Sequence, residues 1–176
     1  MLALYDRGAA ALSRMGDDLL PVLARFVFAA VLLVYYWNSG LTKIDGFGLS
    51  SGAYVQIFPK AMEAVGYNTA ELSIFHTLVV LAGTVAEFVL PALIALGLLT
   101  RLAAAGMIGF VVVQSLTDLF GHGGIAHEGT LGAWFDRFSD ALILDQRAFW
   151  VLALLVLVMK GGGWLSLDRV LAARRP

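Results

Sequence analysis

Charged and hydrogen-bonding side chains inside apolar stretches are the residues of this chain best suited to chemistry. Glu87 is the only formally charged side chain between Ser73 and Leu99. That run is long enough to cross a bilayer, which takes about 20 residues. A carboxylate at this depth costs about 2.5 kcal/mol or more unless a partner or water compensates it. We therefore expect Glu87 to have either a structural partner or a function.

The residues around Glu87 suggest proton chemistry on one helix face. His76 lies 11 residues earlier, which is about three helical turns. Gly83 shares that face and lets a neighbouring helix approach. Pro91 cannot donate to the carbonyl of Glu87 and should kink the helix. We expect this face to look into the bundle, with Glu87 and His76 as candidate catalytic residues that relay protons.

Arg25 is the predicted counter-charge of Glu87. It lies inside the first apolar segment, and its Cα level differs from that of Glu87 by roughly 9 Å. An extended guanidinium and a bridging water can cover that gap. Two interpretations remain open: a structural ion pair that fixes helix register, or a proton- or ligand-responsive carboxylate that Arg25 tunes. A Glu87→Gln variant that folds but is inactive would favour the second.

A second polar group is predicted at the outer mouth of the helices. Gln114 and Asp118 are four residues apart and share a helix face. Quinone headgroups need one or two hydrogen-bond donors in an apolar, aromatic-lined slot; ordinary capping and snorkelling at helix ends is the alternative. The candidate cofactor-binding residues are Arg25, Asn38, Lys43, Gln114 and Asp118, and the candidate aromatic lining is Tyr35, Tyr36, Trp37 and Phe75.

A glycine-rich stretch offers two imidazoles, His122 and His127. Copper or zinc accepts such ligands. The spacing matches no compact metal motif, however, and glycine-rich loops are poorly preorganised. We expect a solvated loop there and assign no metal ligands.

Composition places the chain in the membrane. It is 60% hydrophobic and only 14% charged, with a mean hydropathy of +0.83, whereas soluble domains are about 25% charged. The net charge of −1 gives no electrostatic reason to bind nucleic acid. The sequence has no cysteine, which excludes disulfides, thiolate zinc sites and iron–sulfur ligation by this chain. A partner or a bound cofactor must therefore carry any redox electrons.

The apolar pattern predicts an all-α, integral-membrane four-helix bundle that forms a single domain over 1–176. Two outer loops should carry short amphipathic helices, at 54–65 and 131–144. The first apolar segment ends in aromatic residues and has no small-residue cleavage site, so we expect a retained helix. The membrane helices are expected at about 19–37, 73–99, 102–120 and 145–163.

Three short motifs follow the predicted helices: Gly40-Leu-Thr-Lys43, Gly97-Leu-Leu-Thr-Arg101 and Gly161-Gly-Gly-Trp-Leu-Ser-Leu-Asp168. Together with Arg25 and Glu87, they resemble the DoxX family of small four-helix bacterial membrane proteins. The resemblance implies an inner-membrane redox accessory subunit, quinone-linked and part of an oxidoreductase complex. Its matching polar positions are Arg25, Lys43, Glu87, Arg101 and Asp168. Arg101 and Asp168 are expected to be structural anchors, Asp168 as a cap of the tail helix.

Three functions remain open. The first is the redox subunit, with membrane lipids, a quinone and a protein partner subunit as its partners. The second is a non-enzymatic scaffold that anchors soluble enzymes, such as peptide-maturation or oxidative-stress proteins, through the outer loops. The third is a transporter for a small solute or metal, which the small size and lack of repeats disfavour.

The basic residues predict the orientation. On one side of the four-helix arrangement lie Arg7, Arg14, Arg101, Lys160, Arg169, Arg174 and Arg175. The positive-inside rule makes this side cytoplasmic, so we predict an inner-membrane protein with both termini in the cytoplasm. A reporter fused after Pro176 should therefore give a cytoplasmic signal. An extracytoplasmic signal would overturn this orientation.

Overall fold

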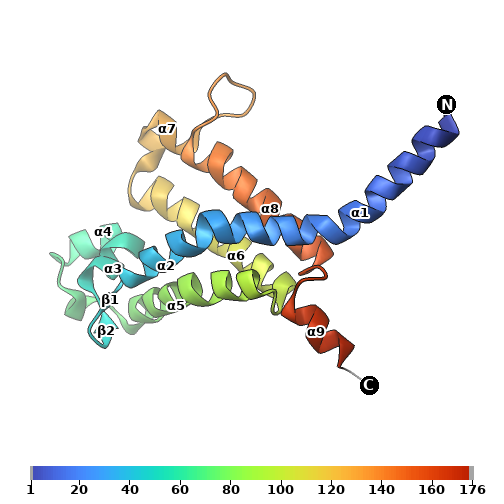
Figure 1. The fold of residues 1–176 in the computed structure, drawn as a ribbon. Helices are drawn as coiled ribbons and strands as arrows, with labels where there is room; N and C mark the ends of the chain where they lie inside the picture. The colour runs from blue at the N-terminus through green and yellow to red at the C-terminus, as the bar shows by residue number, and fades with distance from the viewer. Residues whose placement is uncertain (1, 175–176) are drawn as a thin grey trace.

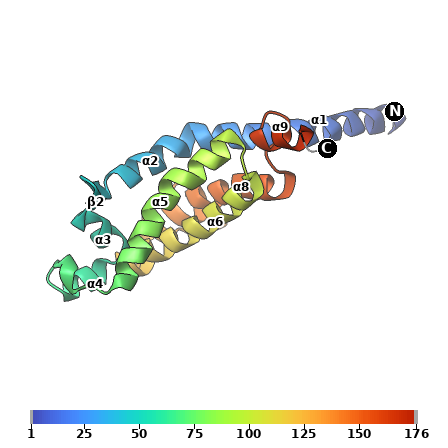
Figure 2. The same ribbon diagram turned by 90° about the horizontal axis from the view of Figure 1, so that it is seen from below.

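The computed structural model describes residues 2–174, so Arg175 and Pro176, which the topology prediction used, lie outside the described residues. Within this range four helices are long and apolar enough to cross a membrane: Leu4–Leu41, Ile74–Leu96, Thr100–Gly121 and Leu142–Lys160. They pack against one another as an all-α membrane bundle, which confirms the predicted fold class. Both termini lie at one end of the bundle, the termini end, and the short loop helices lie at the other, the loop end (Figures 1 and 2).

The first membrane helix is longer than the predicted segment at both ends. It runs through α1 (Leu2–Phe28), a π-helical segment η1 (Ala29–Leu33) and α2 (Val34–Leu41). Its N-terminal part projects beyond the bundle (Figure 1). A π-helical turn inserts into the regular hydrogen-bond ladder and changes which residues face the bundle after it. The faces of α1 and α2 therefore cannot be read from one continuous helical pattern.

The next two membrane helices are antiparallel neighbours. They are α5 (Ile74–Leu96) and α6 (Thr100–Leu116), and the chain turns between them through Gly97 and Leu99, whose φ angles are 69° and 49°. A π-helical segment, η3 (Thr117–Gly121), extends α6. This tight turn fixes the two helices side by side near the termini end.

The fourth membrane helix consists of a π-helical start, η5 (Leu142–Arg147), and α8 (Ala148–Lys160). Gly161 and Gly163 follow with φ angles of 81° and 74°. Other residues rarely adopt this left-handed conformation, so the glycines end the helix. A short helix, α9 (Leu167–Ala173), follows the turn.

The loop between α2 and α5 folds as predicted into short helices. A hairpin of β1 (Ile44–Asp45) and β2 (Gly48–Leu49) leads into α3 (Ser51–Ile57) and α4 (Pro59–Ala64). These helices cover the predicted 54–65 stretch and break at its proline. A single 3₁₀ turn, η2 (Thr69–Glu71), precedes α5.

The loop between η3 and η5 differs from the prediction. It contains η4 (Gly124–Ala126) and α7 (Glu128–Leu131), but residues 132–141 are not helical, so the surface helix predicted at 131–144 is wrong. Gly132, at φ 75°, ends α7. The carboxylate of Asp136 then accepts the backbone N–H of Phe138 at 2.9 Å, a local bond that competes with helix formation.

Arg25 ties α1 to the C-terminal end of α5. Its guanidinium donates to the carbonyl oxygens of Ile94 at 2.9 Å and Ala95 at 2.6 Å. The last carbonyls of a helix have no helical N–H to bond them, and the helix dipole favours a cation there. The same guanidinium donates to the carbonyls of Gly162, at 3.0 Å, and Leu165. One side chain therefore joins α1, α5 and the turn after α8.

The predicted pairing of Arg25 with Glu87 is wrong. Glu87 lies seven residues before Ile94, which is about 10 Å farther along α5. Gly97 also lets the guanidinium come close, because a Cβ there would lie 2.7 Å from Cζ of Arg25. The unbonded carbonyls at the end of α5 are nearer to Arg25 than Glu87 is, and they accept the N–H groups of its guanidinium.

Asp168 caps α6 and not the tail helix. Its carboxylate accepts the backbone N–H of Leu99 at 2.7 Å, the N–H of Thr100 at 2.9 Å and the Thr100 hydroxyl at 2.7 Å. The prediction that it caps the tail helix is wrong, because the Ser166 hydroxyl accepts the N–H of Arg169 there. Asp168 thus connects the segment after α8 to the first turn of α6.

Arg101 completes this end of the bundle. Its Nη1 donates to the carbonyls of Val158 and Met159, both at 2.6 Å. These carbonyls belong to the last turn of α8, where a cation is electrostatically favourable. Arg101 thus joins the first turn of α6 to the last turn of α8.

Asp168→Asn should destabilise the fold at neutral pH by about 1 kcal/mol, because the amide has no charge and only one acceptor oxygen, whereas both carboxylate oxygens accept hydrogen bonds. Burial tends to raise the pKa of Asp168, but hydrogen bonds from Thr100 and Leu99 and the charge of Arg25 outweigh burial and lower it. Because the pKa of Asp168 is lower in the folded state than the unfolded value of about 4, the ionised carboxylate stabilises the fold fully above that pH. This stabilisation is lost as the pH falls through the folded-state pKa. Thermal unfolding in detergent at about pH 7 and about pH 3 measures this change.

Asp18→Asn is the matched control, since Asp18 is an exposed carboxylate at the same end of the bundle. It should leave the unfolding temperature unchanged at both pH values. An equal loss in the two variants, or an Asp168→Asn effect that persists undiminished in acid, would contradict the capping role.

Candidate functional site

A cavity of about 520 Å³ lies between α2, α3, α5 and α6. This volume is typical of small-molecule sites, which usually measure about 300–1,000 Å³. Its walls on α5 and α6 are mostly apolar, with small residues such as Ala82, Gly83 and Gly109. Its polar lining residues are Tyr35, Ser39, Lys43, Gln56, Glu87, Gln114, Thr117, Asp118 and His122.

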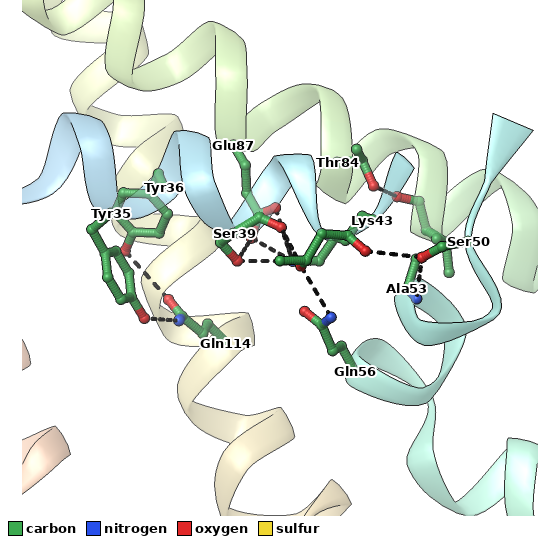
Figure 3. A network of polar contacts seen from close by, with 12 residues as sticks. Tyr35, Tyr36, Ser39, Lys43, Ser50, Ala53, Gln56, Thr84, Glu87 and Gln114 are labelled. Atoms are coloured by element: carbon green, nitrogen blue, oxygen red, sulfur yellow. Dashed lines mark hydrogen bonds and ion pairs between the residues drawn. The ribbon is translucent and has the colours of Figure 1, made fainter. Parts of the chain in front are cut away.

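Lys43 is the counter-charge of Glu87. Its ammonium Nζ lies 3.0 Å from Oε1 and 2.9 Å from Oε2 of the carboxylate. The Ser39 hydroxyl also donates to Oε1, at 3.0 Å. Both charged side chains are only 5% exposed, and Figure 3 shows them meeting between α2 and α5. A buried charge needs such a partner because desolvation costs several kcal/mol per ion.

Two local features bring Lys43 to this position. Gly40 on α2 lies directly against α5, because a Cβ there would come within 2.6 Å of the Phe88 ring. The β1–β2 hairpin then turns the chain back, and the Ser50 N–H donates to the Lys43 carbonyl at 2.9 Å. The Ser50 hydroxyl also accepts the N–H of Ala53 at 3.1 Å and so caps α3. One hairpin therefore fixes both Lys43 and the helix that covers the cavity.

Gln114 connects α6 to two tyrosines of α2. The Tyr36 hydroxyl donates to its Oε1 at 3.3 Å, and its Nε2 donates to the Tyr35 hydroxyl at 3.2 Å (Figure 3). Tyr36 is buried and packs edge-on against Phe110, with ring centroids 5.7 Å apart. Within residues 2–174, no hydrogen bond uses the hydroxyl proton of Tyr35, and Tyr35 lines the cavity. Its O–H is therefore available to a ligand.

A second ion pair closes the site on the side of α8. Nη2 of Arg147 lies 2.5 Å from Oδ2 of Asp118, and Nη1 donates to the Ser115 hydroxyl at 2.9 Å. The Arg147 side chain is 3% exposed, whereas that of Asp118 is 29% exposed and lines the cavity. Each acidic residue of the cavity thus has its own basic partner.

Four of the predicted site residues come together at this cavity: Lys43, Glu87, Gln114 and Asp118. Arg25 does not, since it lies at the termini end. Asn38 is exposed and lies outside the lining, and its neighbour Ser39 faces the carboxylate instead.

His76 lies at the start of α5, away from the cavity lining. Its ring packs edge-on against Phe58, with centroids 4.7 Å apart, and its Nδ1 lies 2.9 Å from the Ser73 hydroxyl. Along the helix it is about 16 Å from Glu87. The structure therefore does not bring these two candidate catalytic residues together.

Three of the four predicted aromatic residues are also outside the lining. Trp37 donates from its indole to the Phe88 carbonyl at 3.1 Å, and Phe75 is exposed. Tyr35 lines the cavity, and Tyr36 lies behind it in the core.

The candidate site residues chosen from the sequence did not include Ser39, Gln56 or Arg147. Arg147 was detectable, because a basic residue at the start of an apolar helix needs an acid, and Asp118 is at a similar level. His122, considered above as a metal ligand, lies at the cavity rim with Nε2 2.9 Å from the Gln56 carbonyl. Within the described part of the chain, no three His, Cys, Asp or Glu residues are grouped closely enough to hold a metal.

The arrangement suits an uncharged ring that carries hydrogen-bond acceptors. The two ion pairs compensate their own charges, which leaves no excess charge for an ionic ligand. The Tyr35 hydroxyl and the Gln114 amide supply donors at the polar end. The apolar walls supply the contact area that small-molecule sites need.

Comparison with known proteins gives one match. The family model described as DoxX matches residues 20–123, and every residue that lines the cavity falls within this range. No curated protein and no solved structure matches the chain significantly. The matched region thus contains the complete cavity, but not Arg147 or Asp168.

Lys43→Met and Glu87→Leu should each destabilise the fold by about 3–5 kcal/mol, because each leaves a buried charge unpaired. The loss of unfolding free energy in the double variant should be much smaller than the sum of the losses in the two single variants, since neither charge then remains. Denaturant unfolding in detergent micelles of all four proteins gives the coupling energy.

The ion pair of Asp17 and Lys160 is the control. Its N–O distance of 2.5 Å is even shorter than the 2.9 Å of the buried pair, but its side chains are 64% and 43% exposed. Asp17→Leu and Lys160→Met should therefore couple by less than about 1 kcal/mol. If the losses of unfolding free energy at Lys43 and Glu87 simply added, the two buried charges would not be energetically coupled.

Proposed function

The chain belongs to the DoxX family, and from this we propose that it is a redox accessory subunit of the bacterial inner membrane whose cavity takes the headgroup of a quinone. The observation that carries the proposal is the two-sided lining of the cavity. Apolar walls on α5 and α6 meet a polar end formed by Tyr35, Lys43, Glu87 and Gln114. A quinone ring has the same division between an apolar face and accepting oxygens.

Each polar residue has a role in this proposal. Tyr35 donates its free O–H to one quinone oxygen, and Gln114 donates the amide hydrogen that Tyr35 does not use. The carboxylate of Glu87 accepts or returns a proton, and Lys43 compensates its charge in the ionised form. A bound quinone would supply two-electron chemistry coupled to protons. Electrons come from a protein partner, since this chain has no cysteine to carry them.

In the proposed orientation the termini end faces the cytoplasm. Basic residues of that end, such as Arg101 and Lys160, support this choice by the positive-inside rule. The cavity then lies in the outer half of the bilayer, and protons exchanged at Glu87 communicate with the outer face.

A second candidate function is an anchor for a soluble partner at the loop end. The non-helical segment 132–141 extends away from the bundle (Figure 1) and carries large exposed aromatic side chains. Trp134, Phe135 and Phe138 are 63%, 104% and 61% exposed. Clustered exposed aromatics mark surfaces that meet a protein or the membrane interface. This loop is where a scaffold would hold its enzyme.

Tyr35→Phe should weaken quinone binding by about fivefold, because it removes one hydrogen bond to the ring, which is worth about 1 kcal/mol. Equilibrium dialysis of the purified protein against a radiolabelled ubiquinone analogue measures the dissociation constant. The fold should survive, since the Tyr35 hydroxyl only accepts a bond within the described structure.

Tyr67→Phe is the matched control, because Tyr67 is an exposed tyrosine in the loop before α5. It should bind the analogue as the wild type does. No binding by the wild type, or equal binding by Tyr35→Phe, would count against the quinone site, and the first outcome would favour the anchor.

A further inference from the structure

The cavity reaches the surface of the bundle between α5 and α6. Ala82 on α5 and Gly106 and Gly109 on α6 line it and are exposed at the same time. Along both helices, exposed residues such as Val85 and Val112 follow these positions and face the lipid. The cavity lining therefore continues into a membrane-facing surface made of small residues.

Packing explains why the opening lies at this level. Near the termini end α5 and α6 touch, because a Cβ at Gly106 would meet Leu90 at 3.3 Å. One turn nearer the loop end, a Cβ at Gly109 would meet nothing within 4 Å. The two helices thus contact each other on the side of the opening nearer the termini end and leave space on the side nearer the loop end.

The polar end behind this opening contains an unsatisfied acceptor. Oε2 of Glu87 is buried and accepts no well-directed hydrogen bond, although Lys43 Nζ lies 2.9 Å away. The residue as a whole is 4% exposed and lines the cavity. A buried acceptor without a donor is costly, so a donor supplied by a ligand, such as a quinol hydroxyl, would be favourable there.

Side-chain contacts narrow the route from the aqueous phase at the loop end. The helix α3 lines the cavity there, and Nε2 of His122 lies 2.9 Å from the Gln56 carbonyl. The Tyr54 hydroxyl donates to Thr77 on α5 at 3.2 Å. Pro59 packs on Gly121, where a Cβ would come within 3.2 Å of it. These contacts narrow the cavity on its aqueous side, where the exposed Gln56 and His122 line it, whereas Ala82, Gly106 and Gly109 open it toward the lipid.

We propose that the ligand is a membrane-borne amphiphile with a long isoprenoid tail, that it enters sideways between α5 and α6, and that its tail stays in this opening. The proposal rests on the proposed function for the chemistry of the headgroup. It adds that Gly109 and Ala82 form the portal and that the tail contributes to recognition.

Gly109→Trp tests the portal, because a Cβ at this position meets no atom within 4 Å and the indole adds bulk at the opening. Two probes share one ring: a ubiquinone with a full isoprenoid tail and the tail-less dimethoxy-methyl-benzoquinone. The variant should bind the tailed quinone at least about tenfold more weakly and the tail-less ring within about twofold of the wild type. Val112→Trp, on the same helix but outside the cavity lining, should change neither value.

Ala82→Trp, on the facing helix, repeats the test in case Gly109→Trp folds poorly. Unchanged binding of the tailed quinone by both portal variants would overturn the portal and leave the quinone site standing. An equal loss of both probes would also overturn it, because the tail would then not be what the opening recognises. If the wild type bound neither probe, both the quinone site and the portal would be refuted.

Discussion

The buried pair of Lys43 and Glu87 is the constraint on which the cavity depends. Both side chains are 5% exposed, and the pair lies where α2, the hairpin and α5 meet. Well-packed apolar residues in place of a buried ion pair are often as stable or more so. Stability alone therefore does not explain why the charges are there. What the pair adds is position: it fixes the end of α2 against α5 and keeps the polar end of the cavity in place.

The rest of the bundle gives this pair a rigid frame. Arg25 and Asp168 fix the α5–α6 turn through carbonyl and N–H groups that helix ends leave unbonded. Arg147 and Asp118 hold α6 and α8 together beside the cavity. Because these contacts fix the α5–α6 turn and the far end of α6, the space between the two helices is set by side-chain size.

The sequence predicted the four membrane helices and the short helices of the first outer loop because length and apolar patterning determine them. It did not predict the partners of Arg25 and Glu87, which depend on how far adjacent helices are offset along their axes. It also could not choose Ser39 over Asn38. Successive residues differ by about 100° around a helix, and the π-helical segment η1 shifts the facing residue by an amount that no regular pattern reveals.

The carbonyl partners of Arg25 have a consequence for biosynthesis. Gly162 and Leu165 lie 137 and 140 residues after Arg25 in the chain. The N-terminal helix leaves the ribosome long before them, so its guanidinium must enter the bilayer with part of its donors still hydrated or shared with lipid phosphates. Docking of the turn after α8 then supplies the remaining carbonyl acceptors of Arg25. A chain truncated before Gly162 would lack two of the four carbonyl groups that accept from Arg25.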